Sequence, residues 1–97
     1  MDKRTKKTHI PAVGAAAISL AGHDRGRIYL VVAVVNHEFV LCADGKYRCL
    51  DKPKLKRFKH LKIIQEGTVK AEEINNKKLN DSEIYRRLKE LCRKTIT

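Results

Sequence analysis

Two groups of residues in this sequence have side chains that can bind a polyanion. The first is a short stretch between apolar runs, where Gly22 and Gly26 allow a tight bend and a close approach of the backbone to a partner. Arg25 and Arg27 can then reach phosphate groups, and His23 belongs to the same stretch. Residues 22–27 are therefore a candidate binding loop, and the alternative is an ordinary turn with solvated arginines.

The second group occupies residues 44–62, which contain eight basic and two acidic residues for a net charge of +6. Alternation along a strand would place several of these cations on the face opposite the apolar residues. A solvated surface usually mixes charges of both signs, whereas cations predominate here, so we interpret the segment as a second polyanion site. Its candidate binding residues are Lys46, Arg48, Lys52, Lys54, Lys56, Arg57, Lys59 and His60.

Aromatic residues offer a second route to nucleic acid, because bases stack on aromatic rings. Tyr29 and Phe39 lie inside apolar runs and are expected to fill the core. Tyr47 and Phe58 lie in the basic segment, where either stacking or core packing remains open for each.

Catalysis and metal binding have little support in the sequence. The four histidines lie in an arm, in turns or in the basic segment, without a nucleophile and base at a recognisable spacing. The three cysteines are odd in number and form no CxxC pair, which argues against a disulfide framework and a zinc ribbon. Cys42, Cys49 and His60 are conceivable ligands, but a small buried thiol is the commoner state of such residues. We expect no enzymatic activity, no metal and no cofactor, and a reducing cytoplasmic location.

The overall charge indicates the class of partner. A chain of 97 residues with a formal net charge of +11 is at most one ordinary domain, and its charge favours nucleic acid or an acidic membrane surface. The apolar run at residues 28–35 is too short to span a bilayer. The basic start followed by residues 10–21 resembles a signal peptide, but Pro11 and Gly14 interrupt it, so that interpretation is not favoured.

Hydrophobic periodicity predicts a β-rich domain that positions these groups. Residues 1–12 are basic and unpatterned, so we expect a flexible arm. Residues 13–64 alternate apolar runs with turn signals, and Asp44-Gly45 predicts a tight hairpin because Asp-Gly favours a type I′ turn. Pro53 would then end the ladder. The expected strands are 15–20, 27–35, 39–42, 46–50 and 58–63, which together suggest a small barrel.

The last third of the chain is expected to be helical only at its end. Residues 65–80 form a polar connector. Apolar residues then recur at helical spacing over residues 81–94, and either Asn80 or Asp81 can cap this amphipathic helix.

The glycine stretch resembles a family motif. Gly-His-Asp-Arg-Gly-Arg at residues 22–27, followed by an apolar strand, resembles the KOW motif, a glycine-containing loop that joins two strands of an SH3-like barrel. The sequences ADGK at 43–46, DKPK at 51–54 and KHL at 59–61 are similar to a narrower group. That group comprises archaeal and eukaryotic large-subunit ribosomal proteins and small bacterial KOW proteins. The match spans residues 13–61, and it departs from the group at alanines 15–17 and at Cys49.

This resemblance implies a mainly β, five-stranded SH3-like barrel that binds RNA, with ribosomal RNA as the expected target, through the glycine loop and the basic segment. Ribosomal proteins are further expected partners, membrane is not, and the free chain is expected to be a monomer. The main alternative is a protein-interaction module of SH3-like type in a translation or transcription complex, because fold alone does not decide function. A third class, binding to a membrane surface through the arm and the helix, is disfavoured because the helix lacks Trp and Phe.

Overall fold

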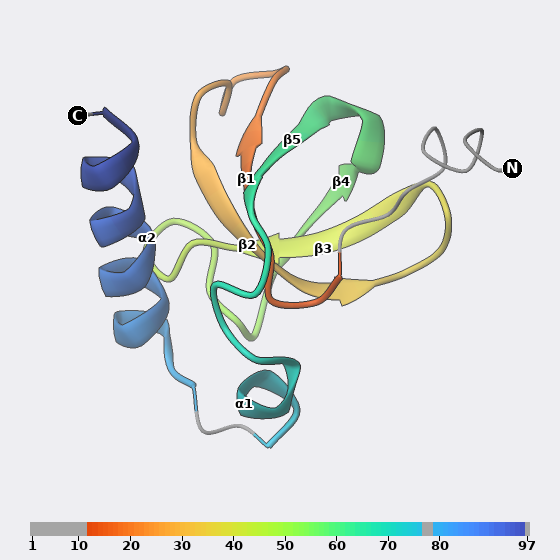
Figure 1. Ribbon diagram of the computed structural model, residues 1–97. Helices are drawn as coiled ribbons and strands as arrows, with labels where there is room; N and C mark the ends of the chain where they lie inside the picture. The colour runs from red at the N-terminus through yellow and green to blue at the C-terminus, as the bar shows by residue number, and fades with distance from the viewer. Residues whose placement is uncertain (1–11, 77–78, 97) are drawn as a thin grey trace, which may run out of the picture.

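One antiparallel sheet forms the body of the protein. The computed structural model describes residues 12–76 and 79–96, and for residues 94–96 it describes the backbone alone. The sheet has five strands in the order β4-β3-β2-β1-β5 (Figure 1). Its strands are β1 (Ala16–Ser19), β2 (Ile28–Val34), β3 (Phe39–Ala43), β4 (Lys54–Arg57) and β5 (Leu61–Gln65).

The sheet is open, because β4 and β5 are its two edges. These edges follow one another in the chain and are joined by a single 3-10 turn, Phe58–His60. The prediction of a mainly β fold with five strands and a C-terminal helix is confirmed, whereas the five strands form an open antiparallel sheet. The predicted arm lies outside the described residues except for Ala12.

Each face of the sheet carries its own apolar cluster. On one face, Ala16 and Leu30 pack with residues that follow the sheet in the chain, including Val69, Ile84 and Leu88. On the other face the buried cluster comes from the strands themselves and consists of Ala17, Tyr29, Val31, Val40, Cys42 and Leu61. The helix thus covers one face, while the strands enclose the other.

Small residues allow β1 to lie between these two clusters. Ala15, Ala16 and Ala17 are completely buried. Ala16 contacts one cluster and Ala17 the other, and β1 pairs with β2 on one side and β5 on the other. The alanines that depart from the KOW resemblance therefore lie at completely buried positions, where bulkier side chains would overpack the core.

The predicted strand at residues 46–50 is wrong. The Asp44 side chain, through Oδ1, accepts hydrogen bonds from the backbone amides of Lys46, Tyr47 and Arg48 at 2.9, 2.8 and 2.8 Å. These bonds hold the chain in an irregular loop, because the carboxylate takes amides that a hairpin would donate across the ladder. The returning strand is β4, and Pro53 precedes it instead of ending the ladder.

The segment after the sheet is more ordered than a polar connector. It contains a short helix, α1 (Ala71–Asn75), and it buries Val69 and Leu79 against the sheet. The C-terminal helix, α2 (Asp81–Ile96), is two residues longer than predicted and packs against β2. Figure 1 shows α2 standing beside the sheet, with α1 at one end of it.

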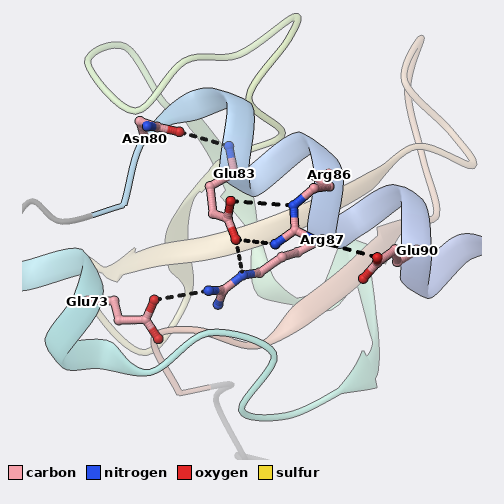
Figure 2. Close-up of polar contacts among 6 residues, drawn as sticks. All are labelled: Glu73, Asn80, Glu83, Arg86, Arg87 and Glu90. Carbon is pink, nitrogen blue, oxygen red and sulfur yellow. Dashed lines mark hydrogen bonds and ion pairs between the residues drawn. The ribbon is translucent and has the colours of Figure 1, made fainter.

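The start of α2 is fixed by a side-chain cap and an ion-pair network (Figure 2). Asn80 Oδ1 accepts a hydrogen bond from the amide of Glu83 at 2.8 Å, so Asn80 is confirmed as the cap. The Glu83 carboxylate contacts both Arg86 and Arg87. Arg87 also reaches Glu73 of α1 at 3.2 Å, which joins the two helices.

Replacing Asn80 with Ala should lower the free energy of unfolding by about 1 kcal/mol, because it removes the acceptor of the Glu83 amide. Urea denaturation measures this change. Asn75→Ala is the matched control, since Asn75 is an exposed asparagine inside α1, and it should be neutral. An equal loss for both variants would contradict the capping role.

Candidate nucleic-acid interface

The glycine loop between β1 and β2 is a closed turn. The Gly26 amide donates to the Ser19 carbonyl at 2.8 Å, and the Arg27 amide donates to the Asp24 carbonyl at 2.9 Å. Gly22 and Gly26 adopt φ values of 85° and 91°, a region that favours glycine. Apart from Asp24, the residues from Gly22 to Gly26 are exposed, and His23 and Arg25 are among them.

Asp24 is the one residue of this loop that turns inward. Its carboxylate accepts hydrogen bonds from the Tyr29 hydroxyl at 2.7 Å and the Ser19 hydroxyl at 3.0 Å. The ammonium of Lys56 lies 3.2 Å from Asp24 Oδ1, and that of Lys54 lies 3.2 Å from Oδ2. Asp24 and Lys56 are 6% and 8% exposed, so this is a buried ion pair between the loop and the edge strand β4.

The pKa of Asp24 shows how these contacts balance. Burial by itself raises the pKa of the carboxyl, but the hydrogen bonds from Tyr29, Ser19, Lys56 and Lys54 outweigh it and hold the pKa well below its ordinary value of 3.8. For Tyr29 the effects act together. Burial first, and then the hydrogen bond to Asp24, raise the pKa of its hydroxyl well above the usual value of 10.0.

The prediction that strand alternation places cations on the face opposite the apolar residues is wrong for Lys56 in β4. Lys56 pairs with Val40 in the ladder and lies on the same, enclosed face, while Leu55 is 53% exposed. The long side chain of Lys56 can cross apolar surroundings because its ammonium ends on Asp24 and on the Ser19 hydroxyl, 2.9 Å away. Arg57 remains exposed, but it forms an ion pair with Glu38 at 2.8 Å.

The other predicted cations stay on the surface. Arg25, Lys46, Arg48, Lys52 and Lys59 are exposed, whereas Arg27 and His60 are half-buried. Within residues 12–76 and 79–96, none of these forms an ion pair with a carboxylate. Of the predicted cations in the described residues, these are the ones whose charge no carboxylate neutralises.

The two predicted groups meet at Tyr47. The Arg27 guanidinium, at the end of the glycine loop, lies 4.2 Å from the centre of the Tyr47 ring. Lys46 Nζ lies 5.3 Å from that ring and 5.4 Å from the ring of Tyr85 in α2, and Lys89 Nζ lies 5.5 Å from Tyr85. Sequence reasoning missed Tyr85 and Lys89, although their spacing of four positions places them on one face of the helix.

The four aromatic candidates differ in how far they are buried. Tyr29 is buried, as predicted, and Phe39 is half-buried, with the Arg57 guanidinium 5.1 Å from its ring centre. Tyr47 is 61% exposed and Phe58 is half-buried. Tyr47 is therefore the better placed of the two predicted stacking residues.

The loop that carries Tyr47 is tied to α2. The Leu50 amide donates to Asp81 Oδ1 at 2.8 Å. Gly45 lies so close to the helix that a Cβ there would overlap the carbonyl oxygen of Asp81 and lie 2.9 Å from the Tyr85 amide nitrogen. The positions of Tyr47 and Tyr85 are thus linked through the backbone.

Other chemistry-bearing groups do not gather in the described part of the chain. Among residues 12–76 and 79–96, no three or more His, Cys, Asp or Glu side chains lie close enough together to hold a metal ion. Burial raises the pKa of the Cys42 thiol to about 12, so this thiol is protonated at neutral pH. None of the helices in these residues has the length and apolar character needed to cross a membrane.

Comparison with known proteins leaves the family open. No protein-family model matches the chain, and no curated protein matches it significantly. A functional proposal therefore rests on the arrangement of the residues described above.

Breaking the buried pair should be costly. Asp24→Asn leaves the Lys56 ammonium buried without its carboxylate, so we expect a loss of roughly 3–5 kcal/mol in unfolding free energy. The double variant Asp24→Asn/Lys56→Met should lose less than the sum of the single variants. Because the folded pKa of Asp24 is lowered, its stabilisation is complete above about pH 4 and is lost as the pH falls below that value.

Denaturation curves between pH 7 and pH 2 test both statements. Arg57→Ala is the matched control, since its exposed pair with Glu38 should contribute at most about 1 kcal/mol. Equal losses for Asp24→Asn and Arg57→Ala would contradict the importance of the buried pair.

A second pair of variants measures the contact between the Tyr47 loop and α2. Gly26 and Gly45 both have positive φ, but a Cβ at Gly26 meets nothing within 4 Å. Gly26→Ala should therefore lower the free energy of unfolding only by the conformational strain at positive φ, roughly 1–2 kcal/mol. Gly45→Ala should lower the free energy of unfolding by roughly 1–3 kcal/mol more, because its Cβ would overlap the Asp81 carbonyl oxygen at the start of α2. Thermal and chemical denaturation measure the difference, and its absence would show that α2 shifts without cost.

Proposed function

We propose that this protein is a non-enzymatic RNA-binding module that acts through the glycine loop and the basic segment. The contact between Arg27 and Tyr47 carries the proposal, because it places the two groups next to each other although 20 positions separate them in the sequence. A continuous basic surface with an exposed aromatic residue suits a phosphate backbone and unstacked bases.

Phosphate neutralisation is the proposed mechanism. The exposed arginines and lysines without carboxylate partners would release counterions from RNA on binding, which gives affinity with modest sequence preference. Lys54 and Lys56 contribute differently from what the sequence suggests. Their charges are directed to Asp24, so they support the loop that presents Arg25 and Arg27.

The fold is consistent with a KOW-type SH3-like barrel. Five antiparallel strands are present, the glycine loop joins β1 to β2, and the last strand returns to pair with β1. On this basis we propose a ribosome-associated or ribosomal-RNA-binding role in the cytoplasm, with ribosomal proteins as neighbours and no cofactor. This part of the proposal rests on the resemblance of residues 22–27, 43–46, 51–54 and 59–61.

One observation favours a protein-interaction function as a second candidate. The helix-covered face of the sheet contains an apolar hollow of about 410 Å³, and exposed Leu55 pairs with Leu41, which lines it. Apolar exposed patches often mark protein contacts. A chain that binds no RNA at low salt would favour this function. The hollow is lined mainly by Val32, Ala33, Leu41, Leu50, Pro53, Ile74 and Leu79.

RNA affinity should depend steeply on salt. If about five phosphates are contacted, log K should fall against log salt with a slope of roughly −3 to −5. The double variant Arg25→Gln/Arg48→Gln removes two exposed cations without acidic partners and should reduce the steepness of the slope by roughly 1–2. Titration of a fluorescently labelled RNA stem–loop at several salt concentrations measures both quantities.

The matched control is Arg86→Gln/Arg87→Gln, which also removes two charges. Both arginines are neutralised locally by Glu83, with Glu73 and Glu90 as additional partners, so the slope should change less (Figure 2). A flat salt response of the unaltered protein would refute phosphate neutralisation.

A further inference from the structure

A small cavity lies where the glycine loop, the Tyr47 loop and helix α2 come together. Its volume is about 200 Å³, and its lining includes Arg27, Ile28, Tyr47, Tyr85, Leu88 and Lys89. These residues come from three separate parts of the chain, so the cavity exists only in the folded molecule with α2 docked.

Apolar and aromatic groups line the interior of this cavity. Leu88 belongs to the apolar cluster under α2, and Ile28 packs against that cluster. Tyr47 and Tyr85 also line the cavity, and they come from distant parts of the chain. The cavity is smaller than the roughly 300–1,000 Å³ of pockets that take a whole drug-sized ligand. It therefore suits one flat ring system and not a complete dinucleotide or cofactor.

Cations surround the two aromatic rings. Lys46 Nζ lies about equally far from both rings, at 5.3 and 5.4 Å, with the Arg27 guanidinium on Tyr47 and Lys89 Nζ near Tyr85. Asp44 also lines the cavity, but its Oδ1 accepts the amides of the Tyr47 loop. The charge facing a ligand is therefore positive.

A nucleotide base is a flat ring attached to a phosphate backbone, so it suits both the aromatic lining of the cavity and the positive charge around it. Bases stack on aromatic side chains and on arginine planes, while lysines close to the same rings neutralise the flanking phosphates. A base in a duplex is already stacked, so only an unpaired base in a loop or bulge can enter. An aliphatic peptide would leave the three cations without a partner.

The backbone that carries Tyr47 is anchored by two side chains. Asp44 fixes the amide of Tyr47 at 2.8 Å, and the Leu50 amide bonds to Asp81 at the start of α2. Even so, 61% of the surface of Tyr47 remains open. Because the backbone that carries Tyr47 is already anchored, base stacking has to order only the side chain, which lowers the entropic cost of binding.

We infer that this cavity is a subsite for a single unpaired RNA base, which stacks on Tyr47 and Tyr85 while Arg27, Lys46 and Lys89 hold its flanking phosphates. The inference rests on the proposed RNA-binding function and specifies it. It also gives helix α2 a part in recognition, in addition to covering the sheet.

The test compares two RNA stem–loops that differ by one bulged adenosine, with 2-aminopurine at the bulge reporting stacking by fluorescence quenching. The unaltered protein should bind the bulged RNA more tightly and quench the probe. Tyr47→Ala should weaken binding of the bulged RNA by roughly 5- to 150-fold and bring it to the affinity of the unbulged RNA. Tyr47→Phe keeps the ring and should retain both the affinity and the quenching.

Leu55→Ala is the matched control, because Leu55 is also a large exposed apolar residue but does not line the cavity. It should change neither affinity. Equal binding of the two RNAs by the unaltered protein, with the steep salt dependence retained, would overturn the base subsite and leave RNA binding intact. A Tyr47→Ala variant that weakens both RNAs equally would also overturn it. Failure to bind either RNA at low salt would remove the proposed function itself.

Discussion

The buried carboxylate of Asp24 connects the parts of this protein on which its candidate interface depends. Asp24 belongs to the glycine loop and accepts hydrogen bonds from the hydroxyls of Ser19, at the end of β1, and of Tyr29, in β2. It also forms ion pairs with two lysines of the edge strand β4. An inward Asp24 anchors the loop, so its neighbours on either side can point outward. The loop therefore presents its arginines from a fixed base, although two of its positions need the flexibility of glycine.

This anchoring changes how the positive charge of the chain should be understood. Residues 44–62 contain eight basic and only two acidic residues, but the structure divides the basic residues by role. Lys54 and Lys56 are directed to Asp24, and Arg57 is paired with Glu38. The cations that remain open lie mainly in the loops beside β4, which moves the centre of the candidate interface toward Tyr47 and the helix.

Local patterns were sufficient to predict the strands and helix that are most regular. The β-branched run of β2, the short apolar run of β3 and the helical spacing of α2 all lie where the sequence places them. Asp44-Gly45 wrongly predicted a hairpin with a strand at residues 46–50. The Asp44 side chain instead accepts hydrogen bonds from the amides that a hairpin would use. Burial of Lys56 could not be predicted, since its partner lies 32 positions away and belongs to another element. The presence of Tyr47 and Tyr85 in one cavity likewise depends on how α2 docks, which no local pattern specifies.

The contact of Gly45 with the start of α2 has a consequence for the order in which the chain folds. Neighbouring strands from β1 to β4 form through hairpins or short connections, and each can begin to pair as soon as it has emerged during synthesis. The contacts between the Tyr47 loop and α2 join residues 31 positions apart, as the Leu50–Asp81 bond shows. Closing so long a segment is slow relative to local pairing, so we expect helix docking to be a late step. Strands β1 to β4 would then be paired before Tyr47 and Tyr85 line one cavity, and a nascent chain would form its glycine loop before its aromatic cavity.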